Sequence, residues 1–235
     1  MAIVHSSGNS GRVTSLGMAD PERPGAARWV PAGAGIDQLA AAARDCEGCE
    51  LYKDAIQTVF SKGSPTARVV FVGEQPGDQE DQQGAPFVGP AGRLLDRALE
   101  QVGIAPADSY VTNAVKHFRF QRATHGKRRI HQTPDMVHIE ACRPWLDAEM
   151  AVLDPEVLVI LGATAGRALL GPSFRVTQQR GLAIPMPPRD GEDAARKAGF
   201  MVPTVHPSAV LRADDQDQAF EAFVKDLRVA ADLLS

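Results

Sequence analysis

The chain has 235 residues, of which 44% are hydrophobic and 23% charged, enough for one large domain whose core needs no disulfides. Its formal net charge of −4 argues against a nucleic-acid coat over the whole surface but leaves room for a local basic patch. Since no apolar run approaches the ~18 residues of a membrane span and no signal peptide is visible, we expect a cytoplasmic protein without membrane contact.

Residues 1–35 are rich in Gly, Ala, Ser and Pro and predict a mostly disordered tail, with Trp29 and Val30 as possible docking residues. Residues 36–235 are predicted to form one domain in which strands and helices alternate. The expected helices cover 36–44, 90–102, 134–153 (kinked or divided by Pro144), 163–170 and 216–234. The expected strands cover 68–73, 109–113, 156–161 and 200–205. This alternation predicts a three-layer α/β/α fold with a central, mainly parallel four-stranded sheet.

Polar residues follow several of these strands, at 73–77, at Asn113, at 162–164 and at 206–208. In open α/β sheets ligands bind beyond the carboxyl ends of the strands, so these segments could form one pocket. The alternative is that they are ordinary turns, in which Gly and Pro are common for backbone reasons.

A long segment, 114–133, separates the second expected strand from the following helix, and loops of this length are usually functional. It has no acidic residue and a formal charge of +6, which leaves −10 on the remainder of the chain. Phe118 and Phe120 alternate with its basic residues, which favours binding to phosphates and stacking on bases. The alternative is a solvated charged loop. The six basic residues are Lys116, Arg119, Arg122, Lys127, Arg128 and Arg129.

The three cysteines suggest a metal or cluster site, because a disulfide framework is unlikely in a chain that is not secreted. Cys46 and Cys49 form a CxxC motif, Cys142 lies in a later helix, and His117 is a candidate fourth ligand. Structural zinc and an iron–sulfur cluster fit this set equally well. A thioredoxin-like redox pair is the third alternative, although no strand precedes Cys46 closely.

Six motifs in this order resemble the uracil-DNA glycosylase superfamily, in particular its iron–sulfur family-4 branch and, within it, the UdgX proteins. The resemblance covers about residues 40–232, and the loop at 127–131 is the mark of UdgX over ordinary family-4 enzymes. The motifs are GEQPG at 73–77, PFVGPAG at 86–92, TNAVKH at 112–117, KRRIH at 127–131, ACRPW at 141–145 and HPS at 206–208.

The resemblance implies a structural 4Fe-4S cluster. Family-4 enzymes use four cysteines, and UdgX proteins are similar to this chain in having His at the third position. The implied ligands are Cys46, Cys49, His117 and Cys142.

The resemblance also implies that the substrate is uracil-containing DNA, including single-stranded DNA, handled by a monomer. Phe87 would stack on the flipped base, and the amide of Asn113 would match O4 and N3–H of uracil. His206 would bind O2 and stabilise the departing base, while Ser208 would contact a phosphate. Gly73 belongs to the same substrate-binding group. Without the resemblance, Phe87 would be read as a core residue and Asn113 as a turn or cap residue.

Glu74 is the only acid of the first motif and would stabilise the sugar cation or activate water, with Gln75 positioning a partner or contacting uracil. His131 is expected to capture C1′ before water does, which would leave a stable covalent adduct. Arg129 would steady the loop or a phosphate. Lys127 and Arg128 would order the loop and position DNA.

Three functions therefore compete. The first is a self-trapping uracil-DNA glycosylase, the second a multiple-turnover family-4 enzyme, and the third a non-catalytic iron–sulfur module that grips DNA through the loop. The polar set Glu74, Asn113 and His206 argues against the third, because a clamp needs no polar pocket.

Overall fold

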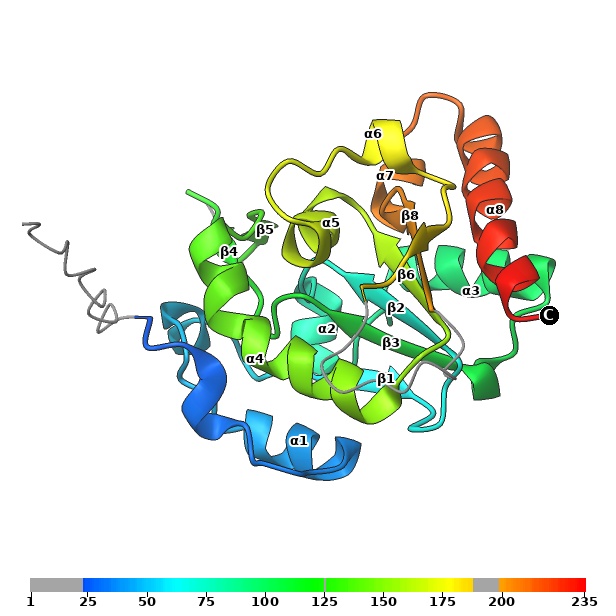
Figure 1. Cartoon of the computed structure of the whole chain (residues 1–235). Coiled ribbons are helices and arrows are strands. Elements are labelled where there is room, and N and C mark those ends of the chain that lie inside the picture. Colours follow the sequence, from blue (N-terminus) through cyan, green and yellow to red (C-terminus); the bar gives the residue numbers. More distant parts are fainter. Residues whose placement is uncertain (1–22, 125, 188–198) are drawn as a thin grey trace, which may run out of the picture.

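The computed structural model describes residues 23–124, 126–187 and 199–235 (Figure 1). Its helices are α1 Ile36–Ala43, α2 Asp78–Gln83, α3 Pro90–Val102, α4 Met136–Leu153, α5 Ala163–Leu170, α6 Val176–Gln179, α7 Pro207–Val210 and α8 Gln216–Leu233. Short 3-10 helices are η1 Ala26–Trp29, η2 Glu50–Lys53 and η3 Pro106–Asp108. The strands are β1 Ser61–Gly63, β2 Val69–Gly73, β3 Ser109–Asn113, β4 Phe120–Arg122, β5 Arg129–His131, β6 Val157–Leu161, β7 Ile184–Pro185 and β8 Phe200–Thr204.

The central sheet has six strands in the order β1-β3-β2-β6-β8-β7. The four central strands are parallel and are those that the sequence predicts, while β1 and β7 pair antiparallel at the two edges. The predicted fold class is confirmed, and the count of four strands is corrected to six. The two edge strands have three and two residues, too few to show a periodic pattern.

Helices cover both faces of this sheet. Val70 and Val72 of β2 pack into the core formed with α1, α4 and α5, whereas Val69 and Phe71 pack into the core formed with α3 and α8. Figure 1 shows the pair α3 and α8 on one side and α1 and α4 on the other. Burial on both faces explains why the central strands read as continuous apolar runs.

Helix α4 runs as one helix through Pro144, so it is not divided there. Pro144 removes the hydrogen bond to the carbonyl of Glu140, a residue that is exposed to water. The helix begins after Asp135, whose backbone N–H donates to Nδ1 of His138 at 3.1 Å.

The segment 114–133 contains structure that the sequence analysis does not predict. Strands β4 and β5 pair antiparallel, with Phe120 opposite His131 and Arg122 opposite Arg129. The loop is therefore a hairpin, and His131 lies at the end where the hairpin joins the domain.

The predicted tail, 1–35, divides in two: residues 1–22 lie outside the described part of the chain, and residues 23–35 fold against the domain. Arg23 forms an ion pair with Glu50 at 2.6 Å, and Ala26 is buried. Trp29 and Val30 pack against the core, as the sequence suggests. The packed domain therefore extends back to Arg23. None of the helices described here is long and apolar enough to span a membrane.

Candidate active site

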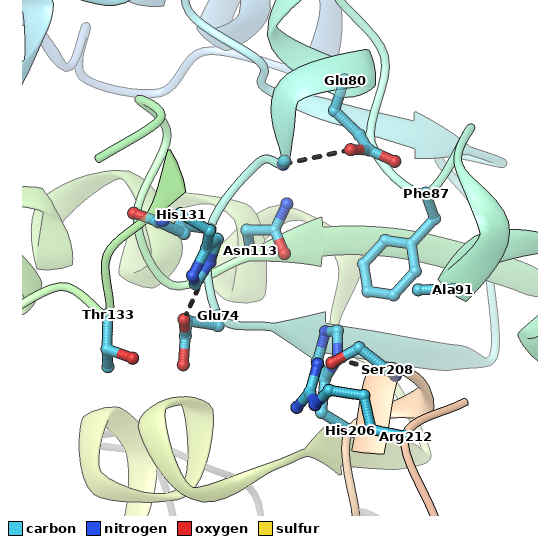
Figure 2. Close-up of a pocket in the computed structure, with 12 residues that line it drawn as sticks. Glu74, Glu80, Phe87, Ala91, Asn113, His131, Thr133, His206, Ser208 and Arg212 are labelled. Atoms are coloured by element: carbon cyan, nitrogen blue, oxygen red, sulfur yellow. Dashed lines mark hydrogen bonds and ion pairs between the residues drawn. The ribbon is translucent and has the colours of Figure 1, made fainter. Parts of the chain in front are cut away.

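The carboxyl ends of β2, β3 and β8 and the base of the hairpin enclose a cavity of about 470 Å³ (Figure 2). Because the four central strands are parallel, residues from distant parts of the chain meet at this edge of the sheet. The structure brings seven of the predicted site residues into the cavity lining: Glu74, Gln75, Phe87, Asn113, His131, His206 and Ser208.

Glu74 and His131 face each other across one side of the cavity, as Figure 2 shows. The Nε2 atom of His131 lies 3.2 Å from Oε1 of Glu74, and the Thr164 hydroxyl donates to Oε2 at 2.5 Å. Burial alone would raise the Glu74 pKa, but the hydrogen bonds from His131 and Thr164 lower it below its ordinary value. Glu74 is therefore a carboxylate at neutral pH, and it can accept a proton from His131.

His206 begins α7 on the opposite side of the cavity. Its Nδ1 accepts the backbone N–H of Ser208 at 3.2 Å, and the Ser208 hydroxyl lies 2.8 Å from the same nitrogen. Burial lowers the pKa of His206 to about 4, although the nearby Glu74 charge opposes this shift. The imidazole is neutral at pH 7, and because Nδ1 is an acceptor, the proton sits on Nε2 as a donor.

Asn113 ends β3 directly beside Gly73, its register partner on β2. Its side chain is buried, and within the described residues its Oδ1 has no hydrogen-bond partner. A buried unpaired acceptor is costly, so this atom is suited to a donor from a ligand. A Cβ at position 73 would lie 2.4 Å from this Oδ1 and 2.7 Å from Cζ of Phe87, so only glycine fits there.

Phe87 closes another wall of the cavity, with its ring centroid 5.9 Å from that of His206. Its backbone has φ of +55°, a left-handed conformation that is unfavourable for a bulky residue. Gly92 makes this possible, because a Cβ there would lie 1.7 Å from the Phe87 carbonyl oxygen. Backbone strain of this kind is often found where a ligand is held.

Gln75 holds the base of the hairpin. Its Nε2 donates to the carbonyls of Arg119 and Gln132, both at 3.1 Å, and its Oε1 accepts the Arg119 N–H at 3.0 Å. Both amide protons are used, so the side chain positions the hairpin and has no donor left for a ligand.

Arg129 joins the hairpin to α2. Its Nε donates to Asp78 at 2.6 Å, its Nη1 donates to Asp81, and its guanidinium lies 5.0 Å from the Phe120 ring centroid. Asp81 is fully buried and also accepts the backbone N–H of Ile56. These bonds tie the hairpin to α2, and Arg129 does not line the cavity.

The formal charge of +6 on residues 114–133 overstates the positive charge that this segment presents at the surface. Lys116 is buried and forms an ion pair with Glu149 at 2.5 Å. Arg119 pairs with Asp135 at 2.8 Å, and Arg129 is paired as described. Three of the six positive charges are therefore paired with acidic side chains that lie outside the segment, and the Lys116 pair is fully buried.

The other three, Arg122, Lys127 and Arg128, are exposed on the hairpin and have no ion-pair partner within the described ranges. They do not line the cavity. They lie on a protruding element beside it, where a polyanion could reach them.

The three cysteines are buried in one apolar cluster, and none forms a disulfide. The Trp145 indole N–H donates to Sγ of Cys46, and the Lys116 backbone N–H donates to Sγ of Cys142, both at 3.3 Å. Burial raises the pKa of Cys49 to about 11 and that of Cys142 to about 12. Such thiols ionise readily only beside a bound cation, so the set fits a metal or cluster.

His117 is buried, and burial lowers its pKa to about 4, so it is neutral, as a ligand must be. The Thr58 hydroxyl donates a hydrogen bond to the Ala43 carbonyl at 2.8 Å. Its oxygen therefore accepts a hydrogen bond from Nε2–H of His117 at 2.9 Å. Nδ1 of His117 therefore keeps its lone pair for a ligand role. Outer-shell hydrogen bonds commonly fix ligand histidines in this way.

These candidate ligands do not converge on one point. Among the residues that the structure describes, no three His, Cys, Asp or Glu side chains are arranged to hold a single metal ion.

Three further residues contribute to the site without being predicted from the sequence. Thr164 anchors Glu74, and Arg212 lines the cavity beside His206. Glu80 accepts hydrogen bonds from the backbone N–H groups of Gly77 and Gly89, at 3.1 and 2.8 Å. It thereby links the segment after β2 to the segment that carries Phe87. Their roles depend on contacts across the fold, although the position of Thr164 after the third predicted strand was a signal.

Comparison with known proteins gives a consistent result. Residues 60–228 match the family model described as the uracil DNA glycosylase superfamily. The matched region includes all seven predicted cavity residues, whereas Cys46 and Cys49 precede it.

Several curated relatives are named type-4 uracil-DNA glycosylase. The protein of Thermotoga maritima is 35% identical over 170 residues, which is 72% of this chain and 79% of the relative. That of Pyrobaculum aerophilum is 32% identical over 169 residues, 72% of this chain and 81% of the relative. That of Sulfurisphaera tokodaii is 29% identical over 191 residues, 79% and 80% of the two chains.

Proposed function

The chain belongs to the uracil-DNA glycosylase superfamily, and on this premise we propose that it excises uracil from DNA and binds the resulting sugar covalently through His131. The observation that carries the covalent step is the 3.2 Å contact between Nε2 of His131 and Glu74 at the edge of the cavity. A nucleophile and its base are thus already paired.

Uracil is selected by hydrogen bonds at the end of β3. The unpaired Oδ1 of Asn113 accepts N3–H of uracil, and the amide NH₂ donates to O4. Cytosine offers an acceptor at N3 and a donor at N4, so it would leave both groups mismatched. Mismatched buried polar groups are costly, which gives the pocket its selectivity. Phe87 stacks on the flipped base.

His206 stabilises the leaving group. With Nδ1 bonded to Ser208, the neutral ring directs its Nε2 proton to O2 of uracil, where negative charge develops. Ser208 thereby fixes the His206 tautomer, and its place at the cavity edge also suits contact with a phosphate.

The covalent step balances as follows. The glycosidic electron pair leaves with N1 of uracil, and the sugar becomes an oxocarbenium-like cation that the Glu74 carboxylate stabilises. The Nε2 proton of His131 passes to Glu74, and the Nε2 electron pair bonds to C1′. Uracil then takes up one proton. The N-alkylated imidazole is a poor leaving group, so the adduct persists.

The hairpin residues around His131 act by position and charge. Gln75 and Arg129 hold His131 beside the cavity. Lys127 and Arg128 attract the DNA backbone, including that of single-stranded DNA, to a protein that acts as a monomer.

Cys46, Cys49, Cys142 and Nδ1 of His117 would hold a 4Fe-4S cluster, which supplies a structural link between the N-terminal segment, the start of the hairpin segment and α4. The buried thiols, their N–H donors and the fixed His117 tautomer support this assignment. Brown colour and stoichiometric iron in the purified protein are expected, and colourless protein with one zinc ion would contradict it.

The main alternative is a multiple-turnover enzyme in which Glu74 activates water and His131 forms no bond. A denaturing gel separates the two after incubation with single-stranded uracil-DNA. We expect a shifted, SDS-resistant band with about one uracil released per protein. Free uracil without a shifted band would refute the covalent step, and the His131→Ser variant should lose the band.

A further inference from the structure

Helix α3 separates its charged side chains onto two faces. Arg93 and Arg97 line a groove of about 390 Å³ between α3 and the segment 210–217. Asp96 and Glu100 line a different cavity, of about 600 Å³, on the other side of the helix. Like charges four residues apart on a helix repel each other. The two exposed arginines give this face of α3 a concentrated positive charge that suits an anionic ligand.

The groove and the active-site cavity are lined by neighbouring residues of the same two segments. Ala91 lines the cavity and Pro90 lines the groove. On the facing element, Arg212 lines the cavity and Leu211 lines the groove. Figure 2 shows Ala91, Ser208 and Arg212 on the side of the cavity that is opposite His131.

Both arginines have guanidinium N–H groups available for an anion. The guanidinium of Arg97 lies 3.7 Å from the Phe220 ring centroid, so stacking occupies its flat face and leaves its in-plane N–H groups available. Arg93 donates to the Val88 carbonyl at 3.4 Å. Neither arginine pairs with a carboxylate in the described part of the chain. Asp217 is the one acidic residue among the described residues that line the groove.

We propose that this groove binds backbone phosphates of the DNA strand on the side of the flipped nucleotide away from the hairpin. The inference rests on the proposed function for the identity of the polyanion. The strand would then cross the cavity from Arg122, Lys127 and Arg128 on the hairpin to Arg212, Arg93 and Arg97. Both anchor regions are positive, and the cavity between them receives the base.

Fluorescence anisotropy with uracil-free single-stranded DNA tests the groove without requiring catalysis. The Arg93→Gln/Arg97→Gln variant should bind several-fold more weakly at low salt. Its log–log salt slope should fall by about 1.4, since each phosphate contact contributes ~0.7 on single strands. The Asp217→Asn variant should bind more tightly than the unmodified chain.

The matched control is Lys225→Gln/Arg228→Gln, which removes the same charge from exposed residues of α8 outside the groove. It should keep the salt slope of the unmodified chain. Equal slopes for the groove variant and this control, or unchanged affinity in Asp217→Asn, would overturn the proposal. Uracil release by the unmodified chain is measured in parallel. Its absence would count against the proposed function alone, because the binding assay contains no uracil.

Discussion

Glu74 is buried and yet ionised, because hydrogen bonds from His131 and Thr164 outweigh the desolvation of its carboxylate. The proposed chemistry needs the ionised form, which stabilises the sugar cation and accepts the His131 proton. The balance at this residue therefore contributes to the acid limit of activity, together with the protonation of His206, whose pKa is about 4.

We expect the Thr164→Val variant to lose activity at a higher pH than the unmodified chain. Glu74 has a lowered pKa, so activity is retained above that pKa and falls as the pH drops through it. A hydrogen bond to a charged group is worth about 1.5–3 kcal/mol, so its loss should move the acid limb upward by about one to two pH units. Single-turnover uracil release measured against pH gives the shift. Thr164→Ser keeps the hydroxyl and should keep the pH profile of the unmodified chain. Identical pH profiles for Thr164→Val and the unmodified chain would contradict the role of Thr164.

Thr58 plays a comparable part for His117, since it fixes which ring nitrogen is free. Loss of an outer-shell partner commonly weakens metal binding by about 10–100-fold. The Thr58→Val variant should therefore be purified with less iron and weaker visible absorbance, while Thr58→Ser should resemble the unmodified chain. Full iron content in the Val variant would show that Nδ1 of His117 does not depend on Thr58.

The sequence predicts residues that lie at strand ends better than it predicts residues that act through space. Asn113 ends β3 and His206 follows β8, so topology alone brings them to one edge of the sheet. The contacts of Thr164 and Thr58 join segments 90 and 59 residues apart, and no local pattern records them. The sequence leaves two roles open for Gln75, and its hydrogen bonds to the base of the hairpin, which favour positioning, are visible only in the fold.

At the scale of elements, the long helices and central strands follow from periodicity, and α3, α5 and β3 have the predicted bounds. The hairpin does not follow from periodicity, because β4 and β5 have only three residues each and depend on contacts with other elements. Arg129 supplies one such contact by pairing with Asp78 and Asp81 on α2. Arg129 thus has a structural role that the basic composition of its segment does not reveal.

The Arg129→Ala variant should detach the hairpin from α2 while leaving the base pocket intact. His131 would then lie less often beside the cavity, so covalent capture should fall at least tenfold and uracil release should fall less. The ratio of shifted band to released uracil measures this separation. The Arg122→Ala variant removes an exposed charge from the paired strand and should leave the ratio unchanged. An equal loss of both activities in Arg129→Ala would show that the hairpin does not act on capture alone.

For the whole molecule, the net charge of −4 conceals a distribution that the sequence reveals only in part. The segment 114–133 is positive in sum, but Lys116, Arg119 and Arg129 are neutralised by acids from elsewhere in the chain. Near the cavity, exposed positive charge lies instead on the hairpin and on the arginine face of α3.

Substitution of Lys116 separates the effect of a buried, paired charge from that of the exposed charges proposed to bind DNA. The Lys116→Met variant leaves Glu149 buried without its ion-pair partner, which costs about 3–5 kcal/mol of unfolding free energy. Urea unfolding should show this loss. At a temperature where the variant is folded, its salt slope for single-stranded DNA should equal that of the unmodified chain. A lower slope with unchanged stability would place Lys116 on the DNA surface instead.

Intact-protein mass after incubation with a single-stranded uracil oligonucleotide tests the covalent mechanism most directly. Covalent capture predicts one new species whose mass equals protein plus oligonucleotide minus uracil, with peptide mapping that places the bond on His131. It also predicts that released uracil stops at one per protein. An unchanged protein mass, together with uracil release that continues beyond one equivalent, would contradict covalent capture and identify a multiple-turnover enzyme.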